Sequence, residues 1–236
     1  MRAAALKQLC FSAATGVTAG RVRFNLLNGY VAQRLLFAGG LERKPVSLAW
    51  FRLLWPLLWQ RRLLMPLVGP KGIYCFYSRK LIRALASQIG DRSCLEIAAG
   101  DGTLSRFLAD EGVEVTATDD HSWKQSISFP DSVRRLDARQ ALRVHQPQAV
   151  VCSWPPAGNP FEREVFKTRS VELYVVVSSR HRFASGDWAA YERQRGFDFA
   201  EDPDLSRLVL PPELEAAVYV FRRRTAGSTR SASPSG

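Results

Sequence analysis

The sequence predicts an α/β fold: a doubly wound, seven-stranded and mostly parallel sheet with a helical N-terminal extension. Two observations lead to this prediction. Over residues 94–178, short apolar runs of strand type alternate with helix-type segments, as parallel strands alternate with their crossover helices. The first such unit, residues 94–118, runs from a strand through a glycine-bearing turn to a helix and a second strand, which is the first half of a mononucleotide-binding fold.

Seven segments are predicted to be strands. Residues 171–178, VELYVVVS, are continuously apolar and mostly β-branched, as expected for a strand that is buried on both faces. Proline pairs at residues 155–156 and 211–212 end the strands before them, because proline donates no ladder hydrogen bond. The expected strands are residues 94–98, 113–118, 133–136, 148–153, 171–178, 205–210 and 216–222.

Helices are predicted between the strands from apolar periodicity and from residues that are typical of helix ends. Gly90, Gly112 and Gly196 stand where three helices are expected to end. Asp187 is placed to cap the start of another helix. The expected helices are residues 79–89, 103–110, 139–145, 161–166 and 187–194.

The chain is predicted to divide at a Gly-Pro-Lys-Gly turn, residues 69–72. Residues 1–72 are interpreted as a basic helical extension or cap, and residues 24–37 within it as a helix. Residues 73–224 are expected to form the α/β domain. The tail, residues 225–236, is rich in Ser, Gly and Thr and is predicted to be disordered.

Within the extension, residues 46–68 are rich in Trp and Leu, but arginines and prolines interrupt them, so no apolar stretch is long enough for a transmembrane helix. Two interpretations remain: a helical cap packed on the core or over the active site, and a basic helix that lies on an anionic membrane. Trp50, Trp55 and Trp59 recur at helical spacing, which favours the packed cap. Residues 1–41, without acids, are similar in composition to an organellar transit peptide.

Charge is distributed unevenly within the net charge of +11. Residues 1–93 carry 15 Lys and Arg but only two acids, a net charge of +13, whereas residues 94–221 carry 14 basic and 20 acidic residues, a net charge of −6. The positive charge of residues 1–93 predicts an anionic partner, which is nucleic acid, an acidic membrane surface or an anionic substrate. The oligomeric state is not indicated by the sequence.

The cysteines and histidines point away from metal binding. The four cysteines have no C-x-x-C spacing and the three histidines are scattered, so we expect no metal site and reduced thiols in a reducing compartment. These features favour a cytoplasmic protein, with peripheral membrane association and organellar targeting as alternatives.

The turn after the first strand, residues 98–102 (AAGDG), suits a ligand that approaches the backbone closely. The helix that follows directs free N–H groups and a positive dipole end to the same place. Asp119, at the tip of the second strand, can accept hydrogen bonds from two ribose hydroxyls. The glycine spacing is that of neither a dinucleotide-binding loop nor a P-loop. Glu96, inside the first strand, needs an ammonium group or backbone amides as its partner.

Residues 96–102, EIAAGDG, resemble the E/D-x-G-x-G-x-G loop of class I S-adenosylmethionine-dependent methyltransferases, with Ala98 in place of the first glycine. The resemblance extends over residues 77–223 and implies an S-adenosyl-L-methionine cofactor and a Rossmann-like sheet that ends in an antiparallel pair. It also implies that Asp119 binds the ribose, that Asp137 faces the adenine amino group and that Trp123 stacks on the adenine. The cofactor-binding residues that it implies are Tyr77, Glu96, Ala98, Ala99, Gly100, Asp101, Gly102, Asp119, Asp120, Trp123, Asp137, Ala138 and Ser153.

Residues 153–157, SWPPA, are similar to the Asp/Asn/Ser-Pro-Pro-aromatic motif of amino-methyltransferases, but Trp154 intrudes before the prolines and the final aromatic is missing. The similarity places Ser153, Trp154 and Asn159 against the methyl acceptor as candidate catalytic residues that position it. Trp154 is interpreted either as a wall of the acceptor pocket or as a plug of the core.

The function that these features favour is S-adenosylmethionine-dependent methyl transfer to an unidentified acceptor, most simply a small molecule. No side chain stands out as an essential base, so we expect positioning to do most of the catalytic work. The alternative is a catalytically silent module of the same fold that binds RNA or an anionic membrane through residues 1–93. An NAD-dependent oxidoreductase is disfavoured by the glycine spacing.

Overall fold

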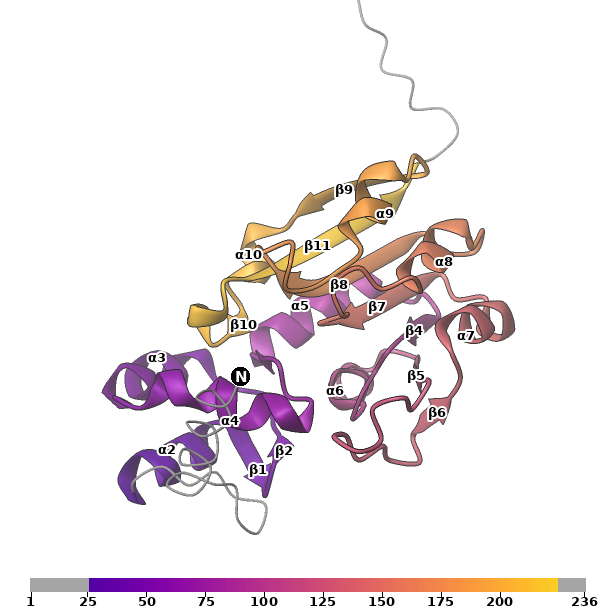
Figure 1. Cartoon of the computed structure of the whole chain (residues 1–236). Coiled ribbons are helices and arrows are strands. Elements are labelled where there is room, and N and C mark those ends of the chain that lie inside the picture. The colour runs from indigo at the N-terminus through magenta and orange to yellow at the C-terminus, as the bar shows by residue number, and fades with distance from the viewer. Residues whose placement is uncertain (1–25, 225–236) are drawn as a thin grey trace, which may run out of the picture.

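The computed structural model describes residues 26–224, and its centre is a seven-stranded sheet with the order β6-β5-β4-β7-β8-β11-β9 (Figure 1). Strand β11 is antiparallel to both of its neighbours, and the other strands run parallel to one another. The predicted fold class is therefore confirmed. The strands are β4 (Cys94–Glu96), β5 (Val115–Asp119), β6 (Val133–Arg135), β7 (Ala149–Ser153), β8 (Leu173–Ser179), β9 (Phe197–Glu201) and β11 (Ala216–Arg223).

Helices cover both faces of the sheet, because alternate residues of the buried strands point to opposite sides. One hydrophobic cluster packs α5 and α6 on one face, and a second packs α7, α8 and α9 on the other. The buried strand β8 contributes to both clusters, with Val175 to the first and Tyr174 to the second. The helices are α5 (Arg79–Ile89), α6 (Thr103–Asp110), α7 (Ala138–His145), α8 (Glu162–Lys167) and α9 (Trp188–Arg193).

The strand predicted at residues 205–210 is wrong in its start and in its place: only residues 209 and 210 form a strand, and it lies outside the main sheet. Asp202 accepts hydrogen bonds from the amides of Asp204 and Leu205 and so starts a short helix, α10 (Pro203–Ser206). The next residues form β10 (Val209–Leu210), which pairs with β3 (Phe76–Tyr77) in a separate two-stranded sheet. The edge of the main sheet is instead β9, whose Phe199 stacks on Phe221 of β11.

The N-terminal elements form a group of their own beside the sheet, coloured indigo to purple in Figure 1. A third hydrophobic cluster joins them and includes Phe51, Trp55 and Phe76. The predicted helix at residues 24–37 is observed as α2, and a hairpin that was not predicted follows it. The elements are α2 (Leu26–Leu36), β1 (Phe37–Gly39), β2 (Glu42–Arg43), α3 (Leu48–Leu54), η1 (Trp55–Leu57), η2 (Arg61–Leu63), α4 (Leu64–Val68) and η3 (Gly69–Lys71).

Several contacts join this group to the sheet domain, among them an apolar contact, a hydrogen bond and the ion pair between Arg106 and Glu42. Leu210 of β10 belongs to the same hydrophobic cluster, and the Trp55 indole donates to the Glu213 carboxylate at 3.1 Å. Of the three tryptophans predicted to share a packed face, Trp55 is buried, but Trp50 and Trp59 are exposed, so that interpretation is wrong for two of them.

The division at residue 72 stays a prediction, as does the disorder of residues 225–236, which lie outside the described part of the chain together with residues 1–25. Between residues 26 and 224, no helix has the length and apolar character needed to cross a membrane.

Candidate functional site

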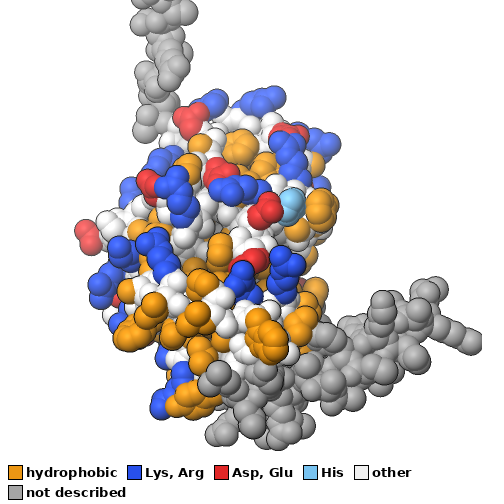
Figure 2. Space-filling model, turned by 90° about the vertical axis from the view of Figure 1, so that its left-hand side faces the viewer, with side chains coloured by type: hydrophobic (Ala, Val, Ile, Leu, Met, Phe, Trp, Pro, Cys, Tyr) orange, Lys and Arg blue, Asp and Glu red, His pale blue; other side chains and the backbone are white. Residues whose placement is uncertain are grey.

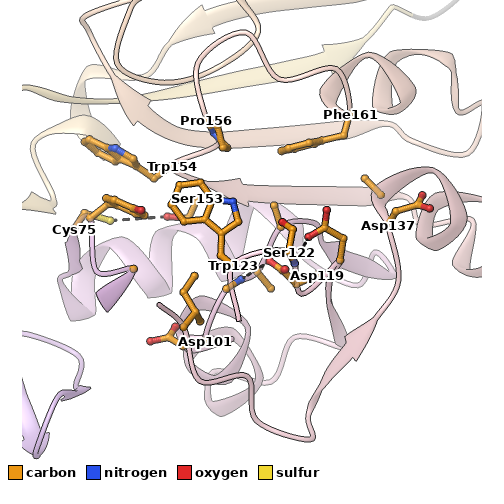
Figure 3. A pocket seen from close by; sticks show the side chains of 18 of the residues that line it. Cys75, Asp101, Asp119, Ser122, Trp123, Asp137, Ser153, Trp154, Pro156 and Phe161 are labelled. Atoms are coloured by element: carbon orange, nitrogen blue, oxygen red, sulfur yellow. Dashed lines mark hydrogen bonds between the residues drawn. The ribbon is translucent and has the colours of Figure 1, made fainter. Parts of the chain in front are cut away.

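A cavity of about 440 Å³ opens where β4, β5 and β7 end, at the carboxyl edge of the parallel strands (Figure 3). Ligands of open α/β sheets bind at this edge, where the chain crosses from one side of the sheet order to the other. Twelve of the fifteen predicted site residues line the cavity: Tyr77, Ala98, Ala99, Gly100, Asp101, Asp119, Asp120, Trp123, Asp137, Ala138, Ser153 and Trp154. Glu96, Gly102 and Asn159 do not.

The turn after β4 has an unusual backbone. Ala98, Gly100 and Gly102 all have positive φ, at 50°, 56° and 68°. Ala98 thus adopts the left-handed region in which glycine costs least, which explains why a glycine is usual at this position of the resembling loop. Gly102 does not line the cavity, and an added Cβ on it would come within 2.7 Å of the Val133 side chain of β6. This glycine therefore allows the start of α6 to pack closely against β6 rather than serving the ligand.

Asp119 holds this turn in place. One carboxylate oxygen, Oδ2, accepts the amide of Gly100 at 3.0 Å, and Oδ1 accepts the amide of His121 at 2.8 Å. Burial is the main influence and raises the pKa of Asp119, while the two amides act to lower it. Each oxygen keeps a further lone pair, and the residue lines the cavity, so both oxygens can also accept hydroxyl groups of a ligand.

Glu96 does not line the cavity but binds the first turn of α6. It is buried, and its Oε2 accepts hydrogen bonds from the amide (2.9 Å) and the hydroxyl of Ser105 in α6. The sequence left two kinds of partner open for Glu96, an ammonium group and backbone amides. In the structure its partner is a backbone amide, together with a hydroxyl. Burial raises the pKa of Glu96 to about 7, although the Ser105 hydrogen bonds act in the opposite direction.

The raised pKa of Glu96 predicts a dependence of stability on pH. Because the folded protein holds this proton more tightly than the unfolded chain, the free energy of unfolding should fall as pH rises from 4.5, the ordinary value, to about 7. The expected loss is about 3 kcal/mol. Denaturant titrations across this range should show a smaller fall in Glu96→Gln than in the wild type, by about the loss assigned to Glu96, because other carboxyls whose pKa is raised by burial, such as Asp119, act in both proteins. Parallel curves for the two proteins would contradict the assignment.

Arg43, in β2, is a lining residue that sequence reasoning missed. Its Nη2 lies 2.6 Å from Asp101 Oδ1, its Nη1 donates to the Cys75 carbonyl at 3.1 Å, and its guanidinium lies over the Tyr77 ring. Burial acts most strongly and lowers the pKa of Arg43, but Asp101 and the other neighbours raise it overall, so the group is a cation. Its buried Nε has no hydrogen-bond partner within residues 26–224.

One side of the cavity is formed by the end of β7 and the loop after it, where the sequence predicted contacts with an acceptor. The Ser153 hydroxyl is hydrogen bonded to the Tyr77 hydroxyl at 2.6 Å. Trp154 has φ of 57°, lines the cavity and also packs against the α5–α6 cluster, so it has the contacts of both a wall and a plug. Pro156 and Phe161, which were not predicted, extend an apolar wall opposite Asp101 (Figure 3). Pro156 belongs to the Pro-Pro step of residues 153–157 but was not singled out as a site residue, and no motif marked Phe161 in the sequence.

Asn159 is turned away from the cavity. Its amide group donates to Glu162 at 2.6 Å and to the Pro156 carbonyl at 2.8 Å. Glu162 is buried and also accepts hydrogen bonds from the hydroxyls of Tyr174 and Tyr191. In this arrangement the Asn159 side chain holds the loop after β7, and it does not line the cavity in which the acceptor was predicted.

The opposite end of the cavity offers groups for a planar ring. Trp123 lines it and is half exposed, and Asp137 caps α7 by accepting the amide of Gln140 at 2.9 Å with one oxygen. Ile127 and Leu136 add apolar surface. No cluster of three or more His, Cys, Asp or Glu residues that could hold a metal ion occurs in the described part of the chain.

The strand order, the antiparallel β11 and the cavity over the turn after β4 define the Rossmann-like fold of class I S-adenosylmethionine-dependent methyltransferases. The family resemblance in the sequence agrees with this fold. None of the known protein-family models matches the sequence, and a comparison with curated proteins finds no match.

Solved methyltransferase structures are similar to this chain. The magnesium protoporphyrin IX methyltransferase of Synechocystis PCC 6803 with bound S-adenosylmethionine is 12% identical, covering 62% of this chain and 79% of that chain at a TM-score of 0.42. The plantazolicin methyltransferase BpumL with S-adenosylhomocysteine is 11% identical, covering 72% of this chain and 93% of that chain at a TM-score of 0.41. The tRNA (uracil-54, C5)-methyltransferase of Pyrococcus abyssi with S-adenosyl-L-homocysteine is 15% identical, covering 61% of this chain and 37% of that chain at a TM-score of 0.37.

Proposed function

We propose that this protein transfers a methyl group from S-adenosyl-L-methionine to a small-molecule acceptor. The proposal rests on one observation: groups from separate parts of the chain line the same cavity. These groups are the left-handed turn after β4, Asp119, Asp137 and the Ser153-Trp154 step. Each of them suits a different part of the cofactor or the acceptor.

The residues present fit the cofactor. Gly100 and its neighbours bring backbone close to the cavity, Asp119 has free lone pairs for a ribose, and Trp123 can stack on an adenine. The unpartnered Arg43 Nε is a buried cationic donor that suits the methionine carboxylate. When bound, the cofactor would supply a methyl group activated by a sulfonium.

The residues near the acceptor support catalysis by positioning. Burial raises the pKa of Tyr77 well above its ordinary value and also raises the pKa of Cys75, so both groups keep their protons at neutral pH and do not serve as bases. Ser153 is held by Tyr77, and the apolar wall of Trp154, Pro156 and Phe161 can orient an acceptor.

A screen with radiolabelled S-adenosylmethionine against small molecules, lipids and tRNA tests the proposal. Label transferred to a small molecule would support it. Tight cofactor binding without transfer to any of the three classes would instead support the alternative of a catalytically silent module, and transfer to tRNA alone would contradict the proposed acceptor class.

The neighbouring acids Asp119 and Asp120 provide a matched pair of variants. Asp119→Ala should weaken S-adenosylmethionine binding by about 2–4 kcal/mol, because it removes charge-assisted hydrogen bonds to the ribose and also frees the Gly100 amide. Asp120→Ala should weaken it much less, since Asp120 accepts a hydrogen bond only from the Ser122 amide among residues 26–224. Titration calorimetry measures both, and the reverse ranking would move the ribose contact to Asp120.

A further inference from the structure

The segment made of α3, η1 and the two residues after η1 carries both buried and exposed apolar side chains. Phe51, Trp55 and Leu58 are buried against the N-terminal cluster. On the outside, Trp50, Leu53, Leu57 and Trp59 are 60%, 60%, 72% and 75% exposed; these four side chains are called the outer face. A helix packed on a globular core needs only one apolar side, so the outer face is not explained by folding.

The outer face is presented on a firm support. The ring of Phe51 stacks on Trp55 at 4.8 Å, and the Trp55 indole donates to both oxygens of Glu213 in the sheet domain. Arg61 also binds Glu213, at 2.9 Å. The exposure of the outer face is therefore a property of the packed structure.

The surroundings of the outer face are basic. Between Glu42 and Asp91 the sequence has nine Lys and Arg residues and no acid. Arg52 and Arg62 are exposed and form no ion pair with any residue in the range 26–224, and Glu213 is already bound by Arg61. Figure 2 shows hydrophobic side chains gathered on this side of the molecule, with Lys and Arg side chains around them.

We propose that the outer face docks on the surface of an anionic phospholipid bilayer. Tryptophan and leucine side chains can enter the boundary between headgroups and acyl chains, while Arg52 and Arg62 remain at the depth of the phosphates. Such docking would hold the cavity, which the same N-terminal elements line through Arg43, at the membrane surface.

The side chains of the outer face and the arginines beside it favour a lipid bilayer over two other candidate occupants, RNA and a second copy of this chain. RNA phosphates would pair with the arginines but would leave Leu53 and Leu57 in water, because an aliphatic side chain offers no ring on which a base can stack. A second copy of this chain would cover the apolar side chains, but a symmetric contact would bring Arg52 and Arg62 of each copy together. An anionic bilayer satisfies both the apolar and the cationic groups.

Co-sedimentation of the full chain with vesicles of phosphatidylcholine, with and without phosphatidylserine, tests the proposal at low and high salt. The wild type should bind the anionic vesicles and lose affinity as salt rises. The double variant Trp50→Ser/Trp59→Ser should bind at least about tenfold more weakly at low salt. Arg52→Gln/Arg62→Gln should bind weakly and lose most of its salt dependence.

Phe183→Ser is the matched control, because Phe183 is an exposed aromatic residue outside the N-terminal elements, and its vesicle binding should equal that of the wild type. All these side chains are exposed, so the melting temperature should not change. Absence of vesicle binding, or binding retained by both double variants, would overturn the proposal. Two further results would also overturn the proposal in a protein that does not bind vesicles. One is tRNA binding that the tryptophan variant abolishes, and the other is concentration-dependent dimerisation that the same variant abolishes.

Discussion

Replacing Gly100 with valine is expected to abolish S-adenosylmethionine binding and to leave the fold largely in place. Gly100 has φ of 56°, a region that a β-branched residue adopts only at a cost of about 1–3 kcal/mol. An added Cβ would meet only the Ile127 side chain, at 3.8 Å, so the surrounding protein can accept it. The branched side chain would nevertheless stand where backbone must approach the ligand, and it would disturb the amide held by Asp119.

Gly112→Val is the matched control for the Gly100 variant. Gly112 also has positive φ, of 88°, but no other side chain or backbone lies near its Cβ position, and it follows the end of α6, away from the cavity. Both variants should lose stability from backbone strain, whereas only Gly100→Val should lose cofactor affinity in calorimetry, by about a hundredfold or more. Undiminished affinity in Gly100→Val, or equal losses in the two variants, would contradict the role given to the turn.

Replacing Arg43 with methionine is expected to weaken both the fold and cofactor binding. The substitution removes a buried cation from Asp101, the Cys75 carbonyl and the Tyr77 ring. Breaking a fully buried pair costs about 3–5 kcal/mol, and roughly 2–3 kcal/mol is expected here, because about a third of the Asp101 side chain is exposed. Cofactor affinity should fall by about tenfold or more through the loss of a charge-assisted hydrogen bond.

Asp101→Asn separates these two effects. It removes the ion pair but keeps the Arg43 guanidinium in the chain, and its amide oxygen can still accept the Thr103 amide that Asp101 now accepts at 3.1 Å. Denaturant unfolding and calorimetry on both variants should show a loss of stability in each and the larger loss of affinity in Arg43→Met. Equal affinities in Arg43→Met and the wild type would remove Arg43 from the cofactor site.

The strand–turn–helix unit of the site was predictable because all its signals are local. The strand-type run of residues 94–98, the glycines of the turn and the acid at position 119 lie within a single stretch of the chain. Arg43 could not be found in this way, because its contact with Asp101 joins residues 58 positions apart, from an element with no recognisable motif.

The errors in the prediction also have physical causes. The apolar content of residues 205–210 is typical of a strand, but Asp202 and Pro203 start a helix there, and the edge strand β9 alternates Phe with acidic residues too weakly to stand out. Helical spacing predicted that three tryptophans would pack together. Spacing cannot tell a buried apolar side from an exposed one when a helix carries both, and α3 with η1 carries both.

The most direct test of the proposed function is a titration of the wild-type protein with S-adenosylmethionine and, separately, with NAD. The cavity at the ends of β4 and β5 predicts binding of one S-adenosylmethionine per chain, competition by S-adenosylhomocysteine and no heat with NAD. Binding of NAD in place of S-adenosylmethionine, or binding of neither compound by folded protein, would contradict the assignment of the cavity as a methyltransferase cofactor site.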